Sequence, residues 1–192
     1  MSLIQTFFPT CAYIENRILS DGQRINLYEK TLKYSEDIRP GGKQWKANVK
    51  NNHGYSDLNA DDDFKKLEGI VTEHVNYFAT SLMSDFKYTC NSSWYNIYDE
   101  NSYQEYHIHT NSIFSAVYFL SYPEGSSPLV FSNEILDMLP MRNIREYNFF
   151  NSGIFEYHAE ENSLIIFRSN VRHMVPKGEN KIPRITLSYN FS

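Results

Sequence analysis

The spacing of hydrophobic residues changes near residue 87, from a helical period to alternation. Before this point one segment repeats apolar residues at intervals of three and four, as one face of a helix requires: Phe64, Leu67, Val71, Val75, Phe78 and Leu82. The run 61–63 is entirely Asp, which suits a helix N-terminus both as a cap and as negative charge. We therefore predict an amphipathic helix over 62–83, after a short strand at 7–14 and a helical stretch at 26–35. No regular element is predicted for 43–59.

After residue 87 the alternation of apolar and polar residues favours β-strands. They are expected near 92–98, 104–109, 112–120, 128–132, 148–157, 162–168, 171–175 and 183–191, with a long loop or short helix at 133–146. Short strands after a helical leader predict a mainly β (α+β) fold. Its form would be a double-stranded β-helix (a cupin-like jelly roll) with supporting N-terminal helices. We expect a single domain over 1–192, in which 1–86 supports a jelly-roll core at 87–192.

Composition narrows the class of protein. The 192 residues carry 18 basic and 23 acidic side chains, a net charge of −5, which argues against a nucleic-acid partner held mainly through phosphates. No apolar run approaches the roughly 18 residues that span a membrane, and the N-terminal sequence lacks the pattern of a secretory signal. Cys11 and Cys90 form no disulfide framework, and we expect both to be small buried side chains. A cytoplasmic protein is predicted, and a homodimer is compatible with the sequence.

The histidines supply the first candidate chemistry. His107 and His109 are two residues apart in a predicted strand, so their side chains would share one face, about 6.5–7 Å apart along the chain. Two imidazoles so placed can bind one metal ion, although such a pair is more often simply solvated. His173 follows the apolar run 164–167 and offers a third ligand, or else a surface residue.

The C-terminal segment 184–191 alternates strictly between two faces. The apolar face is typical of a core: Ile185, Leu187, Tyr189 and Phe191. The other face begins with a cation and continues with two hydroxyls and an amide: Arg184, Thr186, Ser188 and Asn190. A fixed guanidinium with nearby hydroxyls suits the binding of a carboxylate, whereas a solvent-exposed face is the alternative interpretation.

Together these segments resemble the Fe(II)- and 2-oxoglutarate-dependent oxygenases, most closely the small oxygenases of marine bacteria and their phages. The resemblance covers nearly the whole chain and is densest over 94–192. It rests on the matching segments 8–10, 107–109, 111–120, 167–173 and 184–190. If a phage encodes the protein, the expected location is the host cytoplasm.

The resemblance implies a role for each matching residue. His107, His109 and His173 would form the catalytic metal site for Fe(II), although the wider superfamily has Asp or Glu at the position of His109. Glu105, on the same predicted face, could supply the missing carboxylate. Arg184 and Ser188 would hold the distal carboxylate of 2-oxoglutarate.

The preceding strand offers Asn96 and Tyr98 as further candidates for 2-oxoglutarate binding, with core packing as the alternative. Ser115 and Tyr118, on opposite faces of the next strand, are weaker candidates. The implied reaction converts 2-oxoglutarate to succinate and carbon dioxide while hydroxylating a substrate. That substrate, a small molecule or a peptide or protein side chain, is not identified by the sequence.

Two other functions stay open at this point. The chain could be a three-histidine, cupin-like dioxygenase that needs no 2-oxoglutarate, but Arg184 and Ser188 argue against it. It could also be a non-catalytic jelly-roll binding module, which the histidine at position 109 favours. His53, His74 and His158 are expected to have packing or surface roles.

Overall fold

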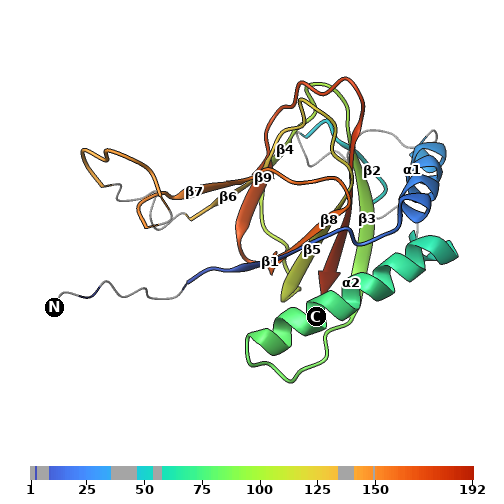
Figure 1. Cartoon of the computed structure of the whole chain (residues 1–192), viewed down its shortest axis with the longest axis horizontal. Coiled ribbons are helices and arrows are strands. Elements are labelled where there is room, and N and C mark those ends of the chain that lie inside the picture. The colour runs from blue at the N-terminus through green and yellow to red at the C-terminus, as the bar shows by residue number, and fades with distance from the viewer. Residues whose placement is uncertain (1–2, 4–8, 36–46, 54–57, 134–140, 149) are drawn as a thin grey trace.

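Two antiparallel β-sheets face each other in the computed structural model, which describes residues 3, 9–35, 47–53, 58–133, 141–148 and 150–192 (Figure 1). The larger sheet has the order β1 (Ala12–Asn16), β8 (Ser163–Arg168), β5 (Phe114–Ser121), β10 (Arg184–Phe191), β3 (Cys90–Tyr98) and β2 (Lys50–Asn51). The smaller sheet has the order β4 (Gln104–His107), β9 (Arg172–Val175), β6 (Leu129–Ser132) and β7 (Ile154–Tyr157). The predicted double-stranded β-helix is confirmed.

Helices cover the outer face of the larger sheet. They are α1 (Asp21–Ser35), the 3-10 turn η1 (Leu58–Ala60) and α2 (Asp62–Ser81), which runs along one side of the sheet (Figure 1). The side chain of Asp61 caps α2 by accepting a hydrogen bond from the Asp63 amide. Lys30 of α1 bonds both carboxylates at 2.7–2.8 Å, so the cap of one helix also fastens the other.

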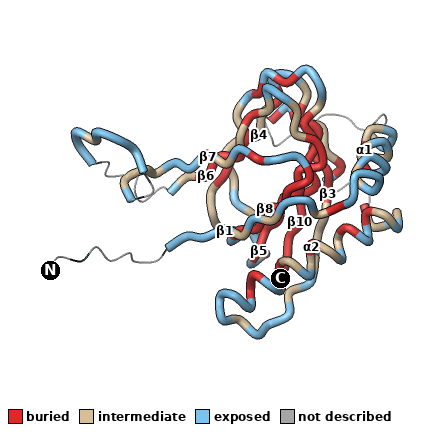
Figure 2. The backbone as a smooth tube through the Cα atoms, viewed as in Figure 1, coloured by how far each residue is buried: buried red, intermediate tan, exposed pale blue. Residues whose placement is uncertain are grey.

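The central strands β8, β5 and β10 of the larger sheet are buried on both faces, because helices cover one side and the smaller sheet covers the other (Figure 2). On the helix side, the predicted stripe of α2 is buried from Phe64 to Phe78, in one cluster with the apolar face of β10. The last predicted member of the stripe, Leu82, lies at the helix cap and is exposed. On the inner side, Tyr98, Val117 and Phe119 pack with residues of the smaller sheet. The polar face of β10 therefore lies between the sheets, and the solvent-exposed interpretation of that face is wrong.

Several predicted boundaries shift in the structure. α1 begins at Asp21, before the predicted 26, and β1 begins at Ala12, while 4–8 lie outside the described residues. β4 ends at His107, two residues before the prediction, and β7 is confined to the end of the predicted 148–157 strand. In the interval 133–146 the described residues 141–146 form neither helix nor strand.

The strand β2 was missed because its sequence carries no local period. β2 exists through its pairing with β3, where Lys50 lies opposite Ile97, and the adjacent Asn52 accepts a hydrogen bond from the Tyr95 amide at 2.8 Å.

The prediction of two buried cysteines is wrong for Cys11, which is exposed before the edge strand β1. Among the described residues, no helix has both the length and the apolar character needed to cross a membrane.

Candidate active site

Three histidine side chains converge at one end of the space between the sheets. His107 of β4 lies directly opposite His173 of β9 in the strand register. His109 follows two residues after β4 ends, and its amide donates to the carbonyl of Ser169 at 3.0 Å. One nitrogen from each ring lies within 4.8 Å of the others, a spacing at which three ligands can share one metal ion.

The hydrogen bonds of the three rings determine which ring nitrogen carries the proton. His107 Nδ1 lies 2.7 Å from the carbonyl of Glu105, and His173 Nδ1 lies 2.9 Å from the carbonyl of Val171. His109 Nδ1 lies 2.6 Å from Asn190 Oδ1. Because these oxygens only accept, each Nδ1 carries a proton and each Nε2 keeps its lone pair. This is the form of histidine that binds a transition metal.

The site also keeps the imidazoles uncharged. Burial lowers the pKa of His107, and burial lowers the pKa of His109 to about 4. The pKa of His173 falls well below its usual value, first because the ring is buried and then because the other two imidazoles repel its charge. All three rings are therefore neutral at physiological pH, as metal ligation requires.

Glu105 does not join the three histidines in the group of potential metal ligands found among the described residues. The register of β4 against β9 shifts between Gln104 and His107, so three residues on one strand span two on the other. This bulge breaks the alternation on which the shared face of Glu105 and His107 was predicted. The backbone carbonyl of Glu105 meets the His107 ring, 2.7 Å from Nδ1.

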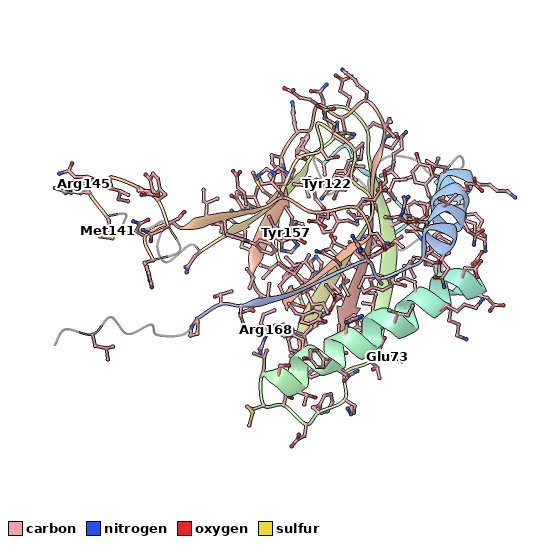
Figure 3. All side chains as sticks on the ribbon, viewed as in Figure 1. Glu73, Tyr122, Met141, Arg145, Tyr157 and Arg168 are labelled. Carbon is pink, nitrogen blue, oxygen red and sulfur yellow. The ribbon has the colours of Figure 1, made fainter. Side chains whose placement is uncertain are left out.

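A buried cation lies on the same inner face of the larger sheet. Arg184 is 1% exposed, and its Nε and Nη1 atoms have no hydrogen-bond partner among the described residues. Its guanidinium carbon lies 4.5 Å from the ring centre of Tyr98, 5.4 Å from Phe119 and 5.8 Å from Tyr122, which is labelled in Figure 3. Burial lowers its pKa, but an arginine stays protonated in proteins. An unpaired buried guanidinium is costly, so this pocket suits an anion.

Polar side chains continue from Arg184 along the same face. The side-chain amide of Asn96 in β3 donates to Ser188 Oγ at 3.1 Å and to Thr186 Oγ1 at 3.5 Å. Its Oδ1 is buried and has no hydrogen-bond partner among the described residues. Tyr98 lies opposite Arg184 in the register, and its hydroxyl donates to Gln104 at 2.8 Å. Thr186, the other hydroxyl of the face predicted to suit a carboxylate, stands between Arg184 and Ser188 and is buried.

The two weaker candidates separate as their alternation predicts. Ser115 faces the histidines, with Oγ 2.8 Å from His109 Nδ1. Tyr118 points to the helix side, where its hydroxyl donates to Asn162 at 2.8 Å.

The position of His53, beside a neighbour of His109, was not predicted from the sequence. Its ring centre lies 4.8 Å from that of Trp94, which in turn lies 5.5 Å from the ring of His109. No period in 43–59 could have indicated this, because β2 and the chain after it are placed by pairing with β3. His74 Nδ1 lies 3.0 Å from the Tyr13 hydroxyl, and His158 lies near Glu156 on the surface. Neither of these contacts involves the three histidines.

Comparison with known proteins decides the family. The family model described as "Putative 2OG-Fe(II) oxygenase" matches residues 92–190, more than half of the chain. The chain belongs to this 2OG-Fe(II) oxygenase family. The enzyme therefore uses Fe(II) and 2-oxoglutarate, and no curated protein matches it. The narrower resemblance to marine bacterial and phage enzymes stays a prediction.

Solved structures share the fold of this oxygenase at low sequence identity. A prolyl-4-hydroxylase of Pseudomonas putida is 12% identical with a TM-score of 0.64, over 95% of this chain and 92% of that one. The 2-oxoglutarate-dependent epimerase SnoN from nogalamycin biosynthesis is 12% identical with a TM-score of 0.70, over 95% and 78%. HygX of Streptomyces hygroscopicus, solved with nickel, 2-oxoglutarate and hygromycin B, is 9% identical with a TM-score of 0.63, over 95% and 83%.

The residues of this oxygenase fit both groups that the family requires. Three neutral imidazoles whose Nδ1 atoms carry the proton form a donor set that suits Fe(II). The buried guanidinium of Arg184, with Nε and Nη1 unpartnered among the described residues, suits a carboxylate of 2-oxoglutarate. When bound, the iron and its cosubstrate supply the oxidative decarboxylation. The chain's own part would be three imidazoles as metal ligands and the guanidinium of Arg184 as a cation for a carboxylate, beside the rings of Tyr98, Phe119 and Tyr122.

Proposed function

We propose that this oxygenase hydroxylates its substrate with release of succinate and carbon dioxide. In this proposal His107, His109 and His173 bind the iron as the catalytic residues. Arg184 and Ser188 bind the distal carboxylate of 2-oxoglutarate. The observation that carries the proposal is the presence, on the inner face of one fold, of three imidazoles with a nitrogen each within 4.8 Å of the others and of a buried guanidinium whose Nε and Nη1 have no partner among the described residues.

The roles of Asn96 and Tyr98 follow from their contacts. Asn96 holds the hydroxyl of Ser188 at 3.1 Å and so orients it for a ligand. The ring of Tyr98 forms one wall beside the guanidinium of Arg184, while its hydroxyl is engaged by Gln104. Tyr98 would therefore shape the 2-oxoglutarate pocket through its ring, and Asn96 through its amide.

Arg184 also separates the proposal from the alternative functions. A cupin-like dioxygenase without 2-oxoglutarate has no use for a guanidinium that is buried and unpaired, since burying such a charge costs several kcal/mol. A binding module could have replaced Arg184 with an apolar residue without losing its fold. Retention of this cation favours a carboxylate cosubstrate.

We place the substrate among small molecules and peptide or protein side chains. The solved relatives include HygX with hygromycin B bound and a Trichoplax adhaerens prolyl hydroxylase in complex with a peptide fragment. Loops on a rigid scaffold commonly provide specificity. We assign this role to the chain around His53 and to the hairpin segment beyond β6, where Met141 and Arg145 project from the body of the molecule (Figure 3). We also propose that the protein acts in the cytoplasm, as a monomer or homodimer, and that it does not bind nucleic acid.

The test begins with anaerobic addition of Fe(II) and 2-oxoglutarate. We expect a weak visible charge-transfer band, followed by succinate release when oxygen is admitted. Arg184→Ala should abolish 2-oxoglutarate turnover and spare metal binding, whereas Arg24→Ala, which removes an outer pair with Glu161, should leave both intact. Bound Fe(II) without the band or succinate would instead support the cupin-like reaction, and no metal binding would support the binding module.

A further inference from the structure

We infer that Asn190 is a positioning residue for His109, holding that imidazole so that Nε2 faces the other two rings. This inference rests on the proposed function, in which His109 is an iron ligand. It concerns the position at which this chain departs from the two-histidine, one-carboxylate pattern of the wider superfamily.

The three histidines are held in different ways. His107 and His173 each donate Nδ1–H to the backbone carbonyl two residues earlier in the chain, at 2.7 and 2.9 Å. The local backbone therefore orients these rings. His109 lies beyond the end of β4 and has no such local partner for its ring among the described residues; its Nδ1 meets the side chains of Asn190 at 2.6 Å and Ser115 at 2.8 Å.

The amide of Asn190 is itself held in one orientation. Its Nδ2 donates to Ser92 Oγ at 3.2 Å, so its Oδ1 points toward the ring of His109. Ser115 Oγ lies 3.0 Å from the same Oδ1 and 2.8 Å from Ser169 Oγ. A consistent set of donors follows: Ser169 to Ser115, then Ser115 and His109 to Asn190, and Asn190 to Ser92.

The proton count of this cluster fixes the tautomer of His109. Asn190 Oδ1 carries no proton, so the contact of 2.6 Å requires the proton to be on Nδ1 of the imidazole. Nε2 then keeps its lone pair. Oxygen acceptors at the second nitrogen make a ligating imidazole a stronger donor. Asn190 in this way offsets part of the charge that the missing carboxylate would supply.

Strand geometry makes this arrangement specific to Asn190. β10 places Asn190 opposite Ser115 of β5 and Ser92 of β3, so both neighbouring strands present a serine to its amide. Asn190 is 9% exposed, which keeps water from replacing the acceptor easily. The same face that begins with Arg184 at one end of β10 therefore reaches the metal site at its other end.

The experiment uses Co(II) as a spectroscopic probe of the whole chain without 2-oxoglutarate. We compare the Co(II) affinity and visible spectrum of the wild type with those of Asn190→Ala, Asn190→Asp and His109→Ala. The matched control is Asn91→Ala, since Asn91 is an exposed residue near the same strand ends whose side-chain amide bonds Asn111 and Ser192. Circular dichroism of each variant checks the fold.

Asn190→Ala should weaken Co(II) binding by about tenfold to a hundredfold and change the visible spectrum, because the acceptor is lost. Asn190→Asp keeps an oxygen acceptor and adds charge, so it should bind Co(II) at least as tightly as the wild type. Wild-type affinity and spectrum in Asn190→Ala would overturn the inference. Equal losses in the Ala and Asp variants would also overturn it, because they would show that the amide N–H rather than the oxygen faces the ring. If His109→Ala binds Co(II) like the wild type, the proposed metal site itself fails, which is a distinct result.

Discussion

Arg184 and Tyr98 face each other across β10 and β3, with the guanidinium carbon 4.5 Å from the centre of the tyrosine ring. The ring stabilises the cation through its π face, a contact of about 2 kcal/mol when it is desolvated. The Tyr98 hydroxyl donates its own proton to Gln104, and Nε and Nη1 of Arg184 have no hydrogen-bond partner among the described residues. The cation is therefore held in place while Nε and Nη1 stay available for a ligand.

Replacing Arg184 by Met should separate ligand binding from stability. We expect 2-oxoglutarate affinity of the Mn(II)-loaded enzyme to fall roughly a hundredfold, since losing a buried charge pair costs about 3 kcal/mol. Without 2-oxoglutarate the variant should be at least as resistant to urea as the wild type, because an unpaired buried charge has been removed. Calorimetric titration and urea unfolding measure the two effects. A variant that loses stability but still binds 2-oxoglutarate would contradict the assignment.

Removing the hydroxyl of Ser188 should have a smaller effect of the same kind. Ser188→Ala deletes one hydrogen-bond donor to the distal carboxylate, worth about 1 kcal/mol, so we expect 2-oxoglutarate affinity to fall roughly fivefold. The comparison is Ser121→Ala, a buried serine whose hydroxyl bonds the carbonyl of Pro183. Titration of both variants with 2-oxoglutarate decides the point, and identical affinities would exclude Ser188 from the pocket.

The metal-free protein should lose stability in mild acid. The pKa of His109 is lowered to about 4 by burial, whereas a histidine in the unfolded chain titrates near 6.5. Between these values the unfolded chain binds a proton that the folded site excludes, so the free energy of unfolding falls as pH falls. The slope is about 1.4 kcal/mol per pH unit for this one group.

This pH effect is isolated by comparing two variants in urea unfolding at pH 7.5 and pH 5. His109→Gln removes the excluded proton, so its stability should fall less steeply than that of the wild type. His158→Gln changes a histidine that is 68% exposed and should keep the wild-type slope. Parallel curves for the wild type and His109→Gln would contradict the prediction.

Asn162 should be the most sensitive polar residue away from the site. It adopts φ 65° and joins β8 to the chain before α1, accepting from the Leu19 amide at 3.0 Å and from the Tyr118 hydroxyl at 2.8 Å. Asn162→Ala leaves both donors unpaired and strains the backbone, so we expect a loss of about 3 kcal/mol in urea unfolding. Asn101→Ala, at φ 61° but exposed, should lose only about 1 kcal/mol. Equal losses would show that backbone strain alone matters.

Local patterns predicted the elements better than their ends. The stripe of α2 and the two faces of β10 are visible in the sequence because a helix repeats every 3.6 residues and a strand every two. β2 is a two-residue strand that exists only through its pairing with β3, and nothing in 43–59 indicates it. The bulge in β4 is equally invisible, because it depends on the register with β9. That bulge is why the alternation argument for Glu105 failed.

The sequence by itself determined the class of fold, the family resemblance and the order of three histidines and an arginine along the chain. Only the tertiary structure decided which surroundings these side chains meet. Burial between two sheets keeps the imidazoles neutral and leaves Nε and Nη1 of Arg184 without a partner in the described part of the chain, and both effects depend on neighbours distant in sequence. Asn190 lies 81 residues from His109 along the chain, so their hydrogen bond exists only where β10 passes beside the end of β4. A residue pattern that repeats along one strand can be recognised in the sequence. The pKa of a buried group and the hydrogen bonds between strands depend on the assembled sheets.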